Sequence, residues 1–198
     1  MELRIFQFLP CTGVDGPGKR ACIQVQGCPI HCSGCAVPQT WPVDGGRLID
    51  TEWLVDQIIS GPLVEGVTFL GGEPFSQASA VADVGRRIRA YDLSVVTFTG
   101  HLLEDIKTAN RQDYDELLAV TDLLIDGPFQ KDSVDFSRPW VGSTNQQYHF
   151  LTDRYKHLAN EIFSIPNRIE IRMMADGRIL INGLAATEDM GALIRGAS

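Results

Sequence analysis

Short apolar runs alternate with amphipathic stretches along most of the chain. Four runs rich in β-branched or apolar residues predict strands, at residues 20–26, 67–70, 93–99 and 122–126. Three amphipathic stretches predict helices, at residues 50–60, 76–90 and 101–118, the last holding one helix or two. Such alternation favours right-handed β-α-β units. We therefore predict an α/β fold: a parallel sheet, open or rolled into a partial (β/α) barrel of parallel strands.

The first predicted helix has clear local signals. Asp50 or Thr51 is a suitable N-cap for it. Trp53, Leu54 and Ile58 are spaced for one face, which we expect to be buried.

The C-terminal part shows a second pattern. Residues 168–174 and 178–181 are β-like runs separated by Ala-Asp-Gly at residues 175–177. Asp-Gly between two apolar runs indicates a hairpin, so we predict a C-terminal β-hairpin extension. Residues 183–198 then predict a short terminal helix or a loose end.

Composition and charge narrow the classes of protein and partner. The 198 residues are 44% hydrophobic and 21% charged, which is typical of a globular chain with a continuous core. The net charge of -8 argues against nucleic acid or an anionic membrane as a main partner. No apolar run is long enough to span a bilayer. Residues 1–10 lack the basic lead of a secretory signal, so we expect a cytoplasmic protein.

Three cysteines carry the clearest chemical signal. Cys28, Cys32 and Cys35 form a Cys-x3-Cys-x2-Cys run after the first predicted strand, and no fourth cysteine follows. Iron-sulfur clusters are normally held by four thiolates, so a cluster held by three leaves one iron open to a small molecule. The alternative is a Cys3His zinc site with His31. That histidine adjoins Cys32, however, and neighbouring residues rarely converge on one tetrahedral ion.

The other cysteines and the histidines give weaker indications. The total of five cysteines is odd, which disfavours a disulfide framework. Cys22 lies inside a predicted strand and is expected to be a small buried hydrophobe. Cys11 has no partner at ligand spacing, so we predict no second cluster. We expect His149 and His157 to be surface or hydrogen-bonded residues, whereas His101 follows a strand end and merits a test.

Three glycine-containing turns follow the next three predicted strands. They are Gly-Gly-Glu-Pro at 71–74, Thr-Gly-His at 99–101 and Asp-Gly-Pro-Phe at 126–129. Each alone is an ordinary tight turn. The carboxyl ends of parallel strands meet at one edge, where ligand sites lie, and glycine lets a backbone approach a ligand. We therefore expect one shared ligand site at this edge.

Together these motifs resemble the radical S-adenosylmethionine (SAM) enzymes of the glycyl-radical-enzyme activase type, most of all the anaerobic ribonucleotide reductase activases. VDGPGKR at 14–20 resembles their Asp-Gly-Pro-Gly-x-Arg segment, and CAVPQTW at 35–41 resembles their Cys-x-Asn-x-x-Thr-Trp segment. GGEP at 71–74 is like the element that binds the amino group of SAM. DGPF at 126–129 and GSTNQ at 142–146 are similar to two segments of the reductase activases.

The resemblance implies a chemistry and a set of site residues. It implies a [4Fe-4S] cluster on Cys28, Cys32 and Cys35, with SAM chelated to the open iron. A 5'-deoxyadenosyl radical would then take a hydrogen atom from a glycine of a partner protein. The cofactor-binding residues it implies are Gly71, Gly72, Glu73, Pro74, Thr99, Asp126 and Asn145. It also implies a glycyl radical protein or peptide as substrate and a reductant such as flavodoxin or ferredoxin.

Two alternatives to glycyl radical activation stay open. One is the same radical step on a peptide or small metabolite. The other is a non-enzymatic metal-binding interaction module.

The chain departs from the activase pattern at a few positions. Val37 stands where asparagine is usual, Val141 where the reductase activases have arginine, and Gln147 where a second arginine is common. These losses leave the cluster and SAM elements intact and predict a target other than the reductase. Gly34 replaces the aromatic residue that many radical SAM enzymes carry there, as it does in the reductase activases.

The resemblance also indicates how the chain is divided. It covers residues 14–146, within one expected domain over residues 1–198. We expect residues 155–198 to be an added element, a structural cap in preference to a docking element. Residues 140–147 are our candidate for the surface that receives a partner's loop.

Overall fold

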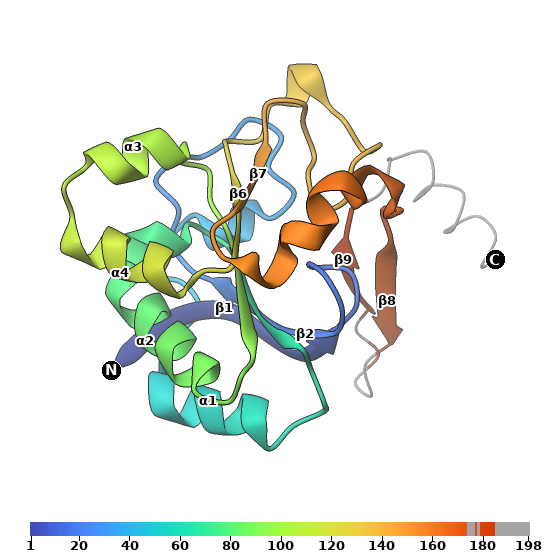
Figure 1. The fold of residues 1–198 in the computed structure, drawn as a ribbon. Helices are drawn as coiled ribbons and strands as arrows, with labels where there is room; N and C mark the ends of the chain where they lie inside the picture. The colour runs from blue at the N-terminus through green and yellow to red at the C-terminus, as the bar shows by residue number, and fades with distance from the viewer. Residues whose placement is uncertain (174–176, 178, 185–198) are drawn as a thin grey trace.

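A computed structural model describes residues 1–173, 177 and 179–184. Its centre is a seven-stranded sheet in the order β3-β1-β2-β4-β5-β6-β7 (Figure 1). The predicted parallel strands are all present, as β2 (Arg20–Val25), β4 (Gly66–Gly71), β5 (Ser94–Phe98) and β6 (Leu123–Asp126). Three further strands were not predicted: β1 (Glu2–Thr12), β3 (Arg47–Asp50) and β7 (Gln147–Phe150).

The sheet is mixed and open, which corrects the prediction of a barrel of parallel strands. The antiparallel strands β1, β3 and β7 flank the parallel ones, and β3 and β7 form the two edges. The connections fit the change of direction, because parallel neighbours are joined by a crossover of a dozen or more residues that usually contains a helix. Only residues 13–19 join β1 to β2. The connection from β6 to β7 holds one short 3-10 turn, η3 (Lys131–Ser133), and no α-helix.

Helices cover one face of the sheet. They are α1 (Thr51–Ile59), α2 (Ala78–Arg89), α3 (Leu103–Thr108) and α4 (Gln112–Val120), which confirms the three predicted helical stretches (Figure 1). Asp50 is the N-cap of α1, since its carboxylate accepts hydrogen bonds from the N–H groups of Glu52 and Trp53. The indole of Trp53 was wrongly placed on the buried face, because it is 45% exposed. The buried stripe follows residues 51, 54, 55 and 58, and position 53 lies outside it.

The sheet separates two apolar layers. Val95 and Leu124 pack with the helices, whereas the neighbouring Val96 and Ile125 face the other side, because successive strand residues point to opposite faces. On that second face the chain from Trp140 onward covers the sheet and supplies the remaining core. Its buried members there are Trp140, Val141, Tyr155 and Ile162.

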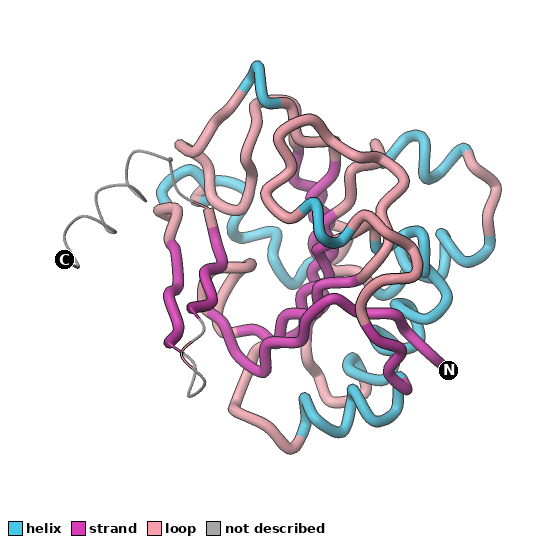
Figure 2. Tube along the Cα trace, turned by 180° about the vertical axis from the view of Figure 1, so that it is seen from behind, coloured by secondary structure: helices cyan, strands magenta, loops and turns pink. Residues whose placement is uncertain are grey.

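The predicted hairpin is present at the C-terminal end. β8 (Ile169–Met173) and β9 (Ile179–Gly183) pair antiparallel and form a sheet of their own beside the main one (Figure 2). Asn182 anchors the hairpin, because its Nδ2 donates to Oγ1 of Thr12 at 2.8 Å and to Oδ2 of Asp15 at 2.7 Å. The terminal helix or loose end was predicted for residues 183–198, and residues 185–198 of this range lie outside the described residues. No described helix has the length and hydrophobicity needed to cross a membrane.

Candidate functional site

The three cysteines lie on one closed loop between β2 and β3. Main-chain bonds close its base, since the N–H of Gly27 donates to the carbonyl of Thr40 at 2.7 Å. Within it, the N–H of Cys35 donates to the carbonyl of Cys32 at 3.1 Å. We name residues 27–41 the cysteine loop. β2 ends directly before it, so the loop starts at the edge where the parallel strands end, which we name the carboxyl edge.

The cysteine side chains are suited to holding a group through thiolates. Cys28, Cys32 and Cys35 are all free and partly exposed. Partial burial raises the pKa of the Cys28 and Cys32 thiols. Main-chain N–H groups oppose this effect, from residues 30 and 31 at Cys28 and from Phe129 at Cys32, because they stabilise the thiolate. A thiolate is the form that binds iron, so this donor set fits an iron-sulfur cluster.

His31 has another role in the loop. Its ring stacks on Trp41 with the centroids 4.6 Å apart and the planes 19° from parallel. Among the described residues, no three His, Cys, Asp or Glu side chains are grouped as ligands of one metal ion, and this includes the three loop cysteines with or without His31. The contact that the structure shows for His31 is the stacking on Trp41.

The cysteine loop lies directly on the strand ends. The N–H of Glu73 donates to the carbonyl of Gly27 at 2.9 Å, and a Cβ atom at Gly72 would clash with that same carbonyl. A Cβ atom at Gly100 would lie 2.6 Å from Cδ1 of Ile30. Glycine is needed at both positions because the loop approaches the backbone so closely. The structure thus brings the cysteine loop, through Gly27 and Ile30, against the turns after β4 and β5.

Glu73 connects two strand ends. Its side chain is 1% exposed, and Oε1 accepts hydrogen bonds from the N–H of Phe75 and Oγ1 of Thr99, each at 2.9 Å. Oε2 accepts from the N–H of Gly100 at 2.9 Å. Burial raises the pKa of Glu73, and these donors oppose the rise. Both oxygens are hydrogen-bonded, so this buried carboxylate ties the turn after β4 to the turn after β5. Pro74 is buried at the start of a 3-10 turn, η2 (Pro74–Gln77).

Asp126 turns toward the helix layer. It is 4% exposed, and Oδ2 accepts a hydrogen bond from the N–H of Leu103 at 2.7 Å, at the start of α3. Nε2 of His149 lies 3.0 Å from the same oxygen but is not aligned as a hydrogen-bond donor. Oδ1 has no partner among the described residues. Sequence reasoning missed His149 because nothing local in the sequence places β7 beside β6.

Asn145 supports the turn that follows Asp126. Its Nδ2 donates to the carbonyl of Pro128 at 2.7 Å, and Nε2 of Gln146 donates to the carbonyl of Gly127 at 3.2 Å. Residues 140–147 therefore fold back against residues 126–129. Oδ1 of Asn145 is buried and unpaired within the described chain.

The remaining sequence candidates divide between surface and core. Val141 is fully buried in the second apolar layer, whereas Gln147 is exposed. Cys22 is fully buried, as predicted, and burial raises the pKa of its thiol strongly. Cys11 lies in β1, where its carbonyl accepts a hydrogen bond from Arg172. Neither cysteine belongs to the cysteine loop.

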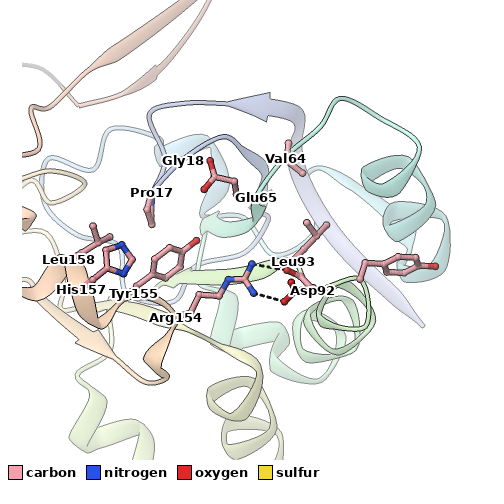
Figure 3. A pocket seen from close by; sticks show the side chains of 11 residues that line it. Pro17, Gly18, Val64, Glu65, Asp92, Leu93, Arg154, Tyr155, His157 and Leu158 are labelled. Atoms are coloured by element: carbon pink, nitrogen blue, oxygen red, sulfur yellow. Dashed lines mark hydrogen bonds and ion pairs between the residues drawn. The ribbon is translucent and has the colours of Figure 1, made fainter.

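A separate cavity lies at the other end of the parallel strands. Its volume is about 620 Å³, and its lining includes Pro17 before β2, Glu65 before β4 and Asp92 before β5 (Figure 3). Arg154 crosses it and donates to Oδ1 and to the carbonyl of Asp92, both at 2.7 Å. These residues precede the strands, so the cavity is not part of the cysteine site.

Comparison with known proteins identifies the cluster domain. The family described as a 4Fe-4S single cluster domain matches residues 14–149. This range contains the cysteine loop and all three glycine turns. The family match supports a 4Fe-4S cluster domain over this range, and the cysteine loop supplies thiolate donors within it.

Several activating proteins that share one name are similar to most of this chain. The anaerobic ribonucleoside-triphosphate reductase-activating protein of Escherichia coli K12 is 32% identical over 154 residues, which are 73% of this chain and 97% of the relative. The protein of that name from Vibrio cholerae is 31% identical, over 74% of this chain and 97% of its own length. The one from Enterobacteria phage T4 is 30% identical, over 75% and 95%. The chain therefore belongs to the 4Fe-4S single cluster domain family and to the family of these activating proteins.

Proposed function

We propose that the chain is a radical SAM enzyme that activates a glycyl radical enzyme. One observation carries the proposal: three free, partly exposed cysteines lie on a closed loop above the ends of parallel strands. Three thiolates leave one iron of a [4Fe-4S] cluster open to the amino and carboxylate groups of SAM. When bound, the cluster supplies the one electron that cleaves SAM to methionine and a 5'-deoxyadenosyl radical. The protein orients SAM and excludes side reactions.

We assign SAM to the ends of β4, β5 and β6. Gly71 and Gly72 let a ligand approach the main chain closely, and Gly71 has a positive φ of 101°. Because the Glu73 carboxylate already accepts three hydrogen bonds, we assign the SAM ammonium to the main chain of this turn. Glu73 and Pro74 then fix the turn. We assign Thr99 and Asp126 to the ribose and carboxylate side, where Oδ1 of Asp126 is unpaired among the described residues.

The names of the relatives make an anaerobic ribonucleotide reductase the first partner to test. In the proposed step the radical takes a hydrogen atom from a glycine Cα of the partner, giving 5'-deoxyadenosine and a glycyl radical. A reductant such as flavodoxin or ferredoxin supplies the electron. The departures at Val141 and Gln147 predict a different target, but Val141 is a core residue and only Gln147 lies on the surface. Burial at position 141 weakens the argument for another target.

Anaerobic reconstitution tests each level of the proposal. We expect about four irons per chain, as in a [4Fe-4S] cluster. We expect dithionite and SAM to give 5'-deoxyadenosine, and addition of an anaerobic reductase to give a glycyl radical signal by electron paramagnetic resonance (EPR). Stoichiometric zinc in place of iron would reject the enzyme and support an interaction module. SAM cleavage without a glycyl radical on the reductase would move the target to another glycyl radical protein, a peptide or a small metabolite.

A further inference from the structure

Phe129 lies between the cysteine loop and residues 140–147. It follows β6 in the turn at residues 126–129 and is half-buried. A Cβ atom at Gly34 would lie 3.3 Å from Cε1 of its ring, and a Cβ atom at Gly142 would lie 3.1 Å from both Cδ2 and Cε2. One residue thus contacts the cysteine loop on one side and residues 140–147 on the other.

The two glycines make this close packing possible. Contacts of 3.0–3.4 Å are tighter than nearly all real Cβ contacts, so a side chain at either position would push the ring. Gly34 also has a positive φ of 81°, which glycine adopts without strain. Gly142 has no such φ, so its contact with the ring is what opposes a larger residue.

The contact with Gly34 brings Phe129 close to the cysteines. Gly34 lies between Cys32 and Cys35, so a shift of the ring displaces the segment that carries both side chains. The main-chain N–H of Phe129 also acts to lower the pKa of the Cys32 thiol, against the larger rise caused by burial. The surroundings of the sulfurs are among the factors that set the reduction potential of an iron-sulfur cluster.

Residues 140–147 are firmly attached to the Phe129 segment. Two hydrogen bonds join them. The N–H of Gln130 donates to Oγ of Ser143 at 3.1 Å, and the N–H of Thr144 donates to the carbonyl of Ser133 at 2.9 Å. Oε1 of Gln146 accepts from the N–H of Gly142 at 2.8 Å. A displacement of residues 140–147 is thus carried into the turn that holds Phe129.

We propose that Phe129 is a positioning residue that couples residues 140–147 to the cysteine loop at Gly34, between Cys32 and Cys35. The inference rests on the proposed function and takes residues 140–147 as the segment that meets the partner, through its exposed positions 144 and 147. Contact with the partner there moves the Phe129 ring, which lies against Gly34, and shifts the loop between the two cysteines. Docking at the surface thereby changes the electronic properties of the cluster.

A double-mutant cycle tests the coupling on the anaerobically reconstituted protein. Gly142→Ala adds a methyl group that pushes the ring from the partner side, without touching the cysteine loop. We expect it to change the EPR spectrum and the midpoint potential of the reduced cluster. Phe129→Ala removes the ring, so adding Gly142→Ala to it should produce no further change. Phe129→Leu keeps part of the bulk of the side chain. In that background, Gly142→Ala should cause an intermediate change in the EPR spectrum and the midpoint potential, and this variant serves as the test if Phe129→Ala folds poorly.

Gly13→Ala is the matched control. A Cβ atom at Gly13 would have nothing within 4 Å, and its φ is not positive, so the substitution is a glycine-to-alanine change without a new contact. A Gly142→Ala cluster spectrum and potential equal to those of Gly13→Ala would overturn the proposal. A Gly142→Ala effect that persists in full without the ring would overturn it too. These readouts need neither SAM nor a partner. A wild-type chain that binds no cluster would instead reject the proposed function.

Discussion

The two ends of the parallel strands differ in which polar groups they hold and in how exposed those groups are. At the amino end, Arg20 is fully buried, yet its guanidinium donates to neutral oxygens of five surrounding residues. At the carboxyl end, three cysteines are free and partly exposed. Among the described residues, buried oxygens without partners occur at both ends, on Asp126 and Asn145 at the carboxyl end and on Asn182 beside Thr12 and Asp15 at the amino end. A buried polar group without a partner costs free energy, so natural structures rarely keep one without a reason. Arg20 thus stabilises the fold at the amino end, whereas the cysteines at the carboxyl end stay open, which is where we propose that a group binds.

The largest effect we expect is at the carboxyl end. Alanine at Cys28, Cys32 or Cys35 removes one of only three thiolates, so each variant should lose the cluster. Iron content and visible absorbance after anaerobic reconstitution measure this loss. Cys11→Ala is the matched control, because Cys11 lies in β1 and outside the cysteine loop, and it should keep the cluster. Full iron in any loop variant would contradict the assignment of the ligands.

The next effect concerns the amino end. Arg20→Met should lower the free energy of unfolding by about 3 kcal/mol, since it leaves buried acceptors such as Ser94 and Tyr155 without their donor. Urea unfolding of the metal-free protein measures this change. Arg111→Met is the control, because Arg111 bonds Asp113 on the surface and exposed ion pairs contribute little. SAM cleavage per folded molecule should be the same in Arg20→Met as in the wild type. A selective loss of cleavage would place Arg20 in the site and end the contrast between the two ends.

The sequence predicted some elements of the fold and not others, for a physical reason. The parallel strands and their helices follow from local patterns of apolar residues, so they were found. β3 has only one residue that is not exposed, and β1 contains register shifts and Pro10, so neither has a regular buried face. β7 is an edge strand without a fully buried residue. These strands are set by pairing with distant residues, which a local pattern does not contain.

For the candidate site, the sequence predicted which motifs lie at strand ends but not where their side chains point. The order of cysteines and glycine turns along the chain placed them at strand ends. The direction of a side chain after a strand ends depends on the packing around it. For this reason the orientation of Asp126 toward α3 and the contact of Phe129 with Gly34 were not predictable. Both need the three-dimensional arrangement of β6, β7 and the cysteine loop.

A smaller effect is expected where Asn145 supports the turn after Asp126. Asn145→Ala removes the hydrogen bond to the carbonyl of Pro128, so it should loosen residues 140–147 while the turns after β4 and β5, to which we assign SAM, stay intact. We expect turnover on the true substrate to fall more than SAM binding. Turnover with the partner and SAM affinity, measured on the same preparation, separate the two. Gln147→Ala is the control, because Gln147 is exposed and lies two residues further along the chain. It should change SAM affinity no more than Asn145→Ala does. Undiminished turnover in Asn145→Ala would rule out a role for this residue.

The smallest effect concerns the acid stability of the same surface. Asp135 accepts hydrogen bonds from Oγ and the N–H of Ser137 and from Arg138, which lower its pKa to about 2. Arg138 in turn donates to the carbonyls of Ser143 and Gln146, so this carboxylate supports residues 140–147. Because the folded pKa lies below the ordinary value of 3.8, the stabilisation is present above pH 3.8 and is lost as the pH falls toward 2.

Asp135→Asn tests this pH dependence. The variant cannot titrate at position 135, so it should be less stable than the wild type at pH 5, and the difference should shrink as the pH falls from about 4 to 2. Urea unfolding of the metal-free protein at several pH values measures the difference, and comparing the two proteins isolates Asp135 from the other carboxylates that also titrate there. Ser137→Ala removes the donor with the largest influence on this pKa, so it should reproduce part of the effect. A wild-type minus Asp135→Asn difference that stays constant over this range would show that the carboxylate does not hold the surface through its charge, and would remove residues 135–138 from the support of the carboxyl end.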